Sequence, residues 1–160
     1  MKRHALRSLV VLGGFAMLVG VGCASMESSP RMTAADAVAE RQKLMKANGD
    51  AWKNAQDKAK AGNISGIAAD ADVMAQSAKK ITALFPPGSL EGKTAAKPEI
   101  WQKWPEFEAA AKNLEVEATK LRDTAKTNNA DATQALMKDF GGKACGTCHR
   151  PFRVPPPRQG

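Results

Sequence analysis

Two cysteines and a histidine near the C-terminus form the segment of this 160-residue chain with the clearest chemistry. In Ala144-Cys145-Gly146-Thr147-Cys148-His149 the two thiols lie three positions apart, and the imidazole follows the second thiol directly. Thiols at this spacing can each form a thioether with one vinyl group of a haem, and the next histidine can bind the iron. We therefore predict one covalent haem c, attached through Cys145 and Cys148, with His149 as the proximal axial ligand.

Two other uses of these residues are less well supported. A structural zinc site usually needs four cysteine or histidine ligands. Without its leader, which contains His4, the chain offers only three, namely Cys145, Cys148 and His149. A thioredoxin-like thiol pair needs a strand context, and no segment shows convincing strand alternation. Counting ligands therefore favours haem. The chain shows no nucleophile and base set, so we predict no enzymatic turnover.

The N-terminal 23 residues are typical of an export signal. A basic start is followed by the apolar run Ser8–Gly22, which is short for a membrane span. Cys23 then follows a segment similar to the lipid-attachment box of bacterial lipoproteins, although Gly20 stands where that pattern prefers leucine. We expect residues 1–23 to be a signal and Cys23 to carry a lipid anchor, with ordinary cleavage after Ala24 as the open alternative. Both versions predict a periplasmic protein, tethered to the membrane if lipidated.

The charge pattern is mildly basic and dispersed. The formal net charge is +8, and it falls to +5 when Lys2, Arg3 and Arg7 leave with the signal. Acidic residues alternate with lysines along most of the chain, as on a solvated helical surface. This pattern argues against nucleic acid as a partner, and it is compatible with docking to redox partner proteins.

Helical spacing of apolar residues dominates the rest of the chain. Residues 24–33 have linker composition, and Thr33 to Asp36 form a capped helix start. Proline, glycine and asparagine clusters then divide the chain into helices predicted at 34–61, 64–85, about 104–126, and from about 131 to the cysteines, with a polar loop at 89–99. We predict an all-α, antiparallel up-and-down four-helix bundle over residues 34–153, with haem attachment at its C-terminal end.

The C-terminal part contains two helix-weakening features. Gly141-Gly142 is a weak point within the last predicted helix. Pro151 lies two residues after His149, so we expect the helix to end or kink there. From Arg150 we predict an extended tail, of which residues 154–160 are rich in proline and arginine. A role of this tail in assembly is a third, weaker functional hypothesis.

The chain resembles the class II c-type cytochromes, the cytochrome c′ family, which carry the attachment motif near the C-terminus of a four-helix bundle. The resemblance rests on Arg41-Gln42-Lys43-Leu44-Met45, on Lys97-Pro98-Glu99-Ile100-Trp101 and on Cys145 to Arg153. It implies that Arg41 and Gln42 lie beside the haem propionates, where a guanidinium can hold a carboxylate with two hydrogen bonds. It also implies that Glu99 contacts the haem or its edge, and that Arg153 lies near the proximal histidine.

Met45 decides which function the resemblance implies. It lies one helical turn after Arg41 and therefore on the same helix face. In low-spin members the equivalent methionine sulfur bonds the iron and raises its potential for electron transfer. In cytochrome c′ proper a bulky apolar residue leaves a five-coordinate iron that binds nitric oxide or carbon monoxide. A methionine in an apolar stripe is also often mere packing.

The wider resemblance favours ligation. Gln42 to Gly49, Leu84-Phe85-Pro86 and Lys143 to Cys148 are similar to the methionine-ligated group. We therefore expect Met45 to be the sixth ligand of a one-electron carrier, with the gas-binding protein as the alternative. Family members are often dimers through their first two helices, so a homodimer is also considered, with Trp52 or Ile64 as contact or core residues.

Overall fold

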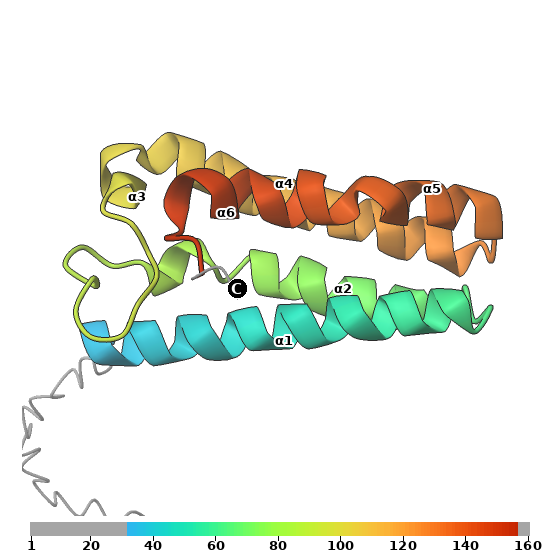
Figure 1. The fold of residues 1–160 in the computed structure, drawn as a ribbon, viewed down its shortest axis with the longest axis horizontal. Helices are drawn as coiled ribbons and strands as arrows, with labels where there is room; N and C mark the ends of the chain where they lie inside the picture. The colour runs from blue at the N-terminus through green and yellow to red at the C-terminus, as the bar shows by residue number, and fades with distance from the viewer. Residues whose placement is uncertain (1–31, 157–160) are drawn as a thin grey trace, which may run out of the picture. The chain divides into compact units, whose positions relative to one another are not determined.

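The computed structural model describes residues 32–156, which belong to one compact helical unit. Their main elements pack as a four-helix bundle in which α2 contacts both α1 and α4 (Figure 1). The bundle consists of α1 (Ala34–Lys60), α2 (Ile67–Ala78), α4 (Trp104–Lys126), and a last stretch formed by α5 (Ala130–Phe140), the π-helical η2 (Gly141–Cys145) and α6 (Gly146–Phe152). The predicted all-α four-helix bundle is confirmed. The signal segment, Cys23 and residues 157–160 lie outside the described residues.

The first helix begins where its cap was predicted. The Asp36 backbone N–H donates to Thr33 Oγ1 at 3.1 Å, and the Thr33 N–H donates to the Asp36 carboxylate at 3.3 Å. This capping box satisfies amide groups that have no partner inside the helix. The helix ends at Lys60, one residue before the predicted limit, and Gly62 then adopts a positive φ of 72°. No helix in the described part is both long and apolar enough to cross a membrane.

The predicted second helix, 64–85, is wrong at both ends. The structure forms α2 only over Ile67–Ala78, then a turn and the short 3₁₀ helix η1 (Thr82–Leu84). Bonds between residues three apart hold this region, including Ile81 N–H to the Ala78 carbonyl at 3.2 Å. Buried Ile81, Leu84 and Phe85 keep a near-helical spacing in this geometry, so apolar periodicity alone did not reveal the change.

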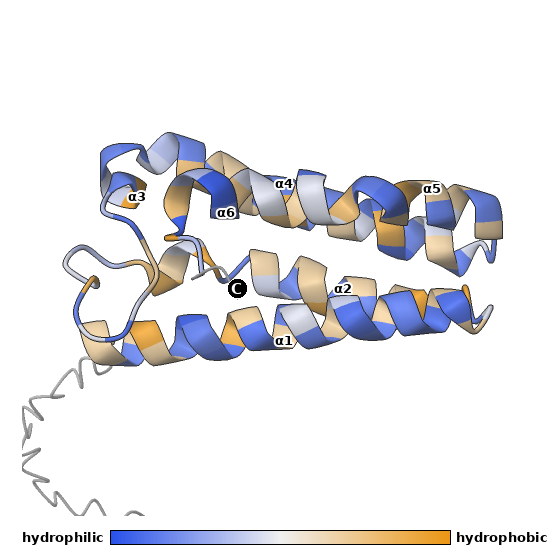
Figure 2. Cartoon of the chain, viewed as in Figure 1, coloured by the Kyte–Doolittle hydropathy of each residue, from blue (hydrophilic) through white to orange (hydrophobic). Residues whose placement is uncertain are grey.

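Aromatic side chains fill the core between the helices. Phe107 on α4 packs edge to face against Phe85 and Phe152, with ring centroids 4.7 and 5.4 Å apart. Trp52 on α1 stacks on Phe140 at 4.8 Å, which makes it an internal packing residue. Ile64 is also buried. Figure 2 shows hydrophilic residues along the visible faces of α1 and α5, as expected for a solvated helical surface.

The last helical stretch corrects one prediction about the C-terminus. Residues 150–152 are helical, because α6 continues through Pro151 to Phe152 before the chain becomes extended at Arg153. The Arg153 N–H donates to the His149 carbonyl at 3.2 Å and closes the last turn across the proline. The predicted weak point at Gly141-Gly142 coincides with the start of η2, where π-helical geometry interrupts the α-helix. Helix α3 (Glu99–Gln102), a single turn before α4, was not predicted from the sequence.

Candidate functional site

A pocket of about 740 Å³ opens between the first and last helices of the bundle. This volume is typical of small-molecule and cofactor sites. Helix α1 contributes four side chains at one-turn spacing, and α6 contributes residues close to the attachment motif. Between them, Ile81, Phe85, Ile100 and Phe107 form apolar walls. The predicted Arg41 and Met45 do lie on one face of α1, because both line this pocket, as do Val38 and Gln42.

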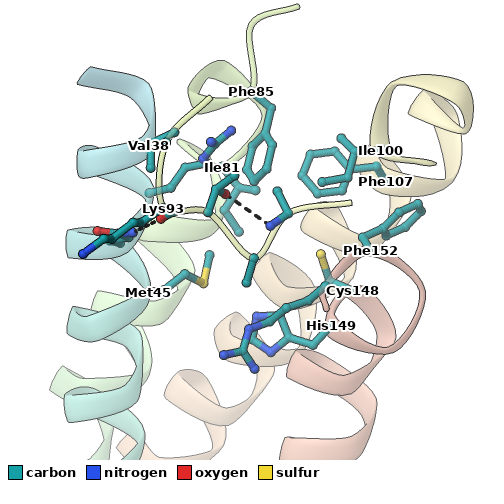
Figure 3. A pocket seen from close by; sticks show the side chains of 17 residues that line it. Val38, Met45, Ile81, Phe85, Lys93, Ile100, Phe107, Cys148, His149 and Phe152 are labelled. Atoms are coloured by element: carbon teal, nitrogen blue, oxygen red, sulfur yellow. Dashed lines mark hydrogen bonds between the residues drawn. The ribbon is translucent and has the colours of Figure 1, made fainter. Parts of the chain in front are cut away.

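Met45 and His149 face each other across the pocket (Figure 3). Met45 is half-buried on α1, and His149 projects from α6. Partial burial, together with the positive charge of Arg153, lowers the pKa of His149. The imidazole is therefore neutral near pH 7, the form in which histidine binds metals.

The two cysteines differ in position. Cys148 lines the pocket, whereas half-buried Cys145, at the end of η2, does not line it and packs against the core. Both thiols are free. Burial raises the pKa of Cys145, and burial together with the nearby Cys145 raises the pKa of Cys148 to about 11. The thiols therefore stay protonated near neutral pH, unlike the thiolates of reactive redox pairs.

The π-helical turn η2 leads directly into the attachment motif and contains Lys143. Asn113 on α4 donates its Nδ2–H to the Lys143 carbonyl oxygen at 2.5 Å. The Thr147 hydroxyl, between the two cysteines, donates to the same oxygen. The motif is thus fixed to α4 as well as to its own helix. Sequence reasoning did not identify Asn113, and nothing in its local pattern marks it.

Arg41 lines the pocket but is only 5% exposed. Its Nη1 donates to Ser89 Oγ at 3.0 Å and its Nη2 to the Ser89 carbonyl at 2.6 Å, while its guanidinium lies 4.4 Å from the centre of the Phe85 ring. Burial lowers the pKa of Arg41. Among the described residues, no carboxylate forms an ion pair with it. Its role beside a haem propionate stays a prediction.

Gln42 and Glu99 are placed differently from each other. Gln42 lines the pocket, and its Nε2 donates to the Lys93 carbonyl at 2.6 Å. Glu99, the first residue of α3, does not line the pocket. Its Oε2 is buried without a hydrogen-bond partner. Their predicted contacts with the haem stay predictions.

The chemistry of the pocket suits a haem. Apart from the Cys148 thiol, its ionisable lining residues are Arg41, Lys93, His149 and Arg153, with no aspartate or glutamate among them. A haem combines a flat apolar ring with two carboxylates, so it requires apolar walls and cationic groups together, and the pocket provides both. Within residues 32–156, no cluster of three or more histidine, cysteine, aspartate or glutamate side chains is arranged to chelate a metal directly.

Several pocket residues were not predicted from the sequence. Ser89 is completely buried, although it lies in a stretch predicted as a polar loop. The segment Gly92–Ala96 forms one wall of the pocket, and Phe152 forms part of another. Loop composition carries no signal for such burial, because the contacts come from distant helices. The glycine at 92, with a φ of +79°, is the one local indication of a defined turn.

Comparisons with known proteins agree on one family. The family described as Cytochrome C' matches residues 36–153. Cytochrome c-556 of Agrobacterium fabrum is 32% identical over 142 residues, which cover 87% of this chain and 92% of that protein. Cytochrome c-554 of Cereibacter sphaeroides is 35% identical over 95 residues, covering 52% of this chain and 61% of the relative.

Solved structures show the same architecture. Cytochrome c' from Thermochromatium tepidum superposes with a TM-score of 0.72 at 26% identity, covering 79% of this chain and 100% of that chain. Cytochrome c' from Rubrivivax gelatinosus gives a TM-score of 0.68 at 25% identity, covering 78% and 100%.

Proposed function

Because this chain belongs to the cytochrome c′ family, we propose that it is a one-electron carrier with a single haem c bound between His149 and Met45. The family consists of haem proteins rather than enzymes, in agreement with the expected lack of turnover. Thioether bonds from Cys145 and Cys148 hold the group in place. When bound, the haem supplies an iron that changes between ferric and ferrous states.

The other residues that line the pocket have separate roles in this proposal. Neutral His149 donates a nitrogen from α6, and Met45 donates a soft thioether sulfur from α1. Ile81, Ile100 and Phe107 exclude water from the apolar face, which helps to set the redox potential. The positive charges of Arg41, Lys93 and Arg153 in the pocket lining compensate the negative charges of the two haem carboxylates.

The observation that carries the proposal is that Met45 and His149 face each other across one pocket. A methionine opposite the proximal histidine is the arrangement that raises a haem potential for electron transfer. The alternative is a five-coordinate iron that binds nitric oxide or carbon monoxide. One observation favours it, since Met45 also packs against the hydrophobic core, as a non-ligating methionine would.

Oxidised and reduced absorption spectra of the wild type and of Met45→Ala test the proposal. We expect low-spin bands in the wild type, and a high-spin ferrous form that binds carbon monoxide in Met45→Ala. The matched control is Met74→Leu, because Met74 is fully buried in the core and does not line the pocket. A high-spin ferrous wild type that binds carbon monoxide readily would reject the electron carrier in favour of the gas-binding protein.

The cellular setting is part of the proposal. Family membership supports a periplasmic location, and the sequence around Cys23 supports a lipid anchor. Redox proteins with acidic surfaces fit the mildly basic charge. A homodimer is the remaining proposal about partners. Intact mass of the protein purified from membranes tests the anchor, because acylation adds the mass of the lipid and ordinary cleavage does not.

A further inference from the structure

One loop segment connects the two walls of the pocket. We call residues Gly92–Lys97 the strap. Five consecutive strap residues, Gly92–Ala96, line the pocket. The strap has internal order, because the Thr94 N–H donates to the Gly92 carbonyl at 3.0 Å and the Ala96 N–H donates to Thr94 Oγ1 at 3.2 Å. These local bonds give the strap a defined conformation between its two ends.

At one end the strap is bound to α1. The Gln42 side chain donates to the Lys93 carbonyl at 2.6 Å, and Figure 3 shows Lys93 beside α1. This is the one side-chain hydrogen bond between α1 and residues 92–97 in the described chain. Gln42 lies three positions before Met45, which is within one turn of the same helix. The strap thus meets α1 next to the proposed sixth ligand.

At the other end the strap is bound to the end of α6. The Lys97 N–H donates to the Phe152 carbonyl at 3.0 Å, and the Val154 N–H donates to the Ala95 carbonyl at 2.8 Å. Ala96 and Arg153 form an isolated antiparallel bridge between these bonds. Phe152 lies three positions after His149. The strap therefore joins points within one helical turn of each proposed ligand.

We propose that Gln42 is a positioning residue. Acting through the strap, it holds the part of α1 that carries Met45 at ligating distance from the part of α6 that carries His149. This inference rests on the proposed ligation by Met45. A methionine side chain has three rotatable bonds and adapts to gaps, so its own packing does not fix the distance between the walls. The strap provides that constraint. This role differs from the propionate contact that the family resemblance implies for Gln42.

Two variants weaken the attachment of the strap at opposite ends, although the Lys97 N–H bond to the Phe152 carbonyl remains in both. Gln42→Glu keeps the size of the side chain but removes its N–H donor at neutral pH. Val154→Pro removes the N–H that reaches Ala95, and the extended backbone of Arg153 (φ −123°, ψ 136°) accepts a following proline. Gln56→Glu is the control, because this exposed glutamine lies on the same helix away from the pocket and makes the same charge change.

Carbon monoxide association with the ferrous protein and the high-spin fraction of its spectrum are the measurements. Loss of one hydrogen bond should raise the association rate on the order of fivefold in Gln42→Glu and in Val154→Pro. The double variant should bind no faster than about the faster single variant, because both changes release the same strap. Gln56→Glu should match the wild type.

Three results would overturn the inference. If Gln42→Glu accelerates binding but Val154→Pro does not, Gln42 acts by direct contact with the haem. If a low-spin wild type and both variants bind carbon monoxide equally slowly, the strap does not control ligation, although Met45 still ligates. If the wild type is already high-spin, the proposed ligation fails and the inference fails with it. Should Val154→Pro not fold, Gly92→Ala replaces it, because the positive φ of Gly92 strains any larger residue.

Discussion

Met45 on α1 and His149 on α6 line the same pocket from facing sides, although they belong to the first and last helices of the bundle. The antiparallel arrangement brings these distant segments together, and the Gly92–Lys97 strap joins their neighbourhoods. This relationship supports a six-coordinate electron carrier. It also makes the pocket sensitive to changes in either wall.

Replacing the cysteines tests the covalent attachment. Cys145→Ala and Cys148→Ala should each retain haem through one remaining thioether, whereas the double variant should lose it. Intact mass after acid-acetone extraction measures the attachment. Thr147→Ala is a control that leaves both thiols in place. Full retention of haem mass in the double variant would contradict attachment through these two residues.

Arg41→Lys should destabilise the protein, because a lysine ammonium cannot reproduce the two guanidinium bonds to Ser89. We expect a loss of about 1.5–3 kcal/mol in the free energy of unfolding, the typical value of a hydrogen bond to a charged group. Urea unfolding at equal haem loading measures it. The exposed Arg150→Lys is the control. Equal stability of Arg41→Lys and wild type would show that the Ser89 contacts contribute little.

Phe107→Ala should be more damaging, because this ring is only 1% exposed and joins Phe85, Phe152 and the pocket wall. We expect a loss of about 3–5 kcal/mol, and a smaller loss for Phe107→Leu, which leaves a smaller cavity. Urea unfolding provides the comparison. If Phe107→Ala and Phe107→Leu lose equal stability, cavity size is not the cause.

Thr33→Ala tests the capping box through its dependence on pH. Hydrogen bonds from the Thr33 side chain and backbone lower the pKa of Asp36 below its usual value. A lowered native pKa gives stability that is present above the pKa of the unfolded chain, about 3.9, and is lost as pH falls through the native pKa. Thr33→Ala should therefore lower the melting temperature at pH 7, and the difference from wild type should shrink below about pH 4. An equal difference at pH 7 and pH 3 would exclude this carboxylate as the source.

Much of the fold follows directly from local sequence signals. The start of α1 was predictable because Thr33 and Asp36 cap it locally. The second helix was predicted too long because Ile81, Leu84 and Phe85 have apolar spacing that suits α and 3₁₀ geometry alike. Their actual path depends on Arg41, whose Nη1 also donates to the Leu84 carbonyl at 3.4 Å, a tertiary contact that periodicity does not encode.

The residues of the candidate site also fall into those that the local sequence marks and those that depend on tertiary contacts. The sequence marks Cys145, Cys148 and His149 as candidates because their spacing is local to six residues. Ser89 and the strap are not marked in this way, because their burial and hydrogen bonds come from helices far away in the chain. Pro151 shows a local rule that holds. It was expected to end or kink the helix, and α6 ends one residue later, at Phe152, where the Arg153 N–H closes the last turn.

The most direct test of the account is the proton NMR spectrum of the ferrous protein with its methionine methyl groups labelled. A methionine bound to haem iron holds its methyl group over the ring, whose current shifts that resonance far upfield of all other methyl groups. We predict one such resonance, present in wild type and Met74→Leu and absent in Met45→Leu. Ordinary methyl shifts for every methionine in a fully reduced, haem-loaded wild type would contradict ligation by Met45.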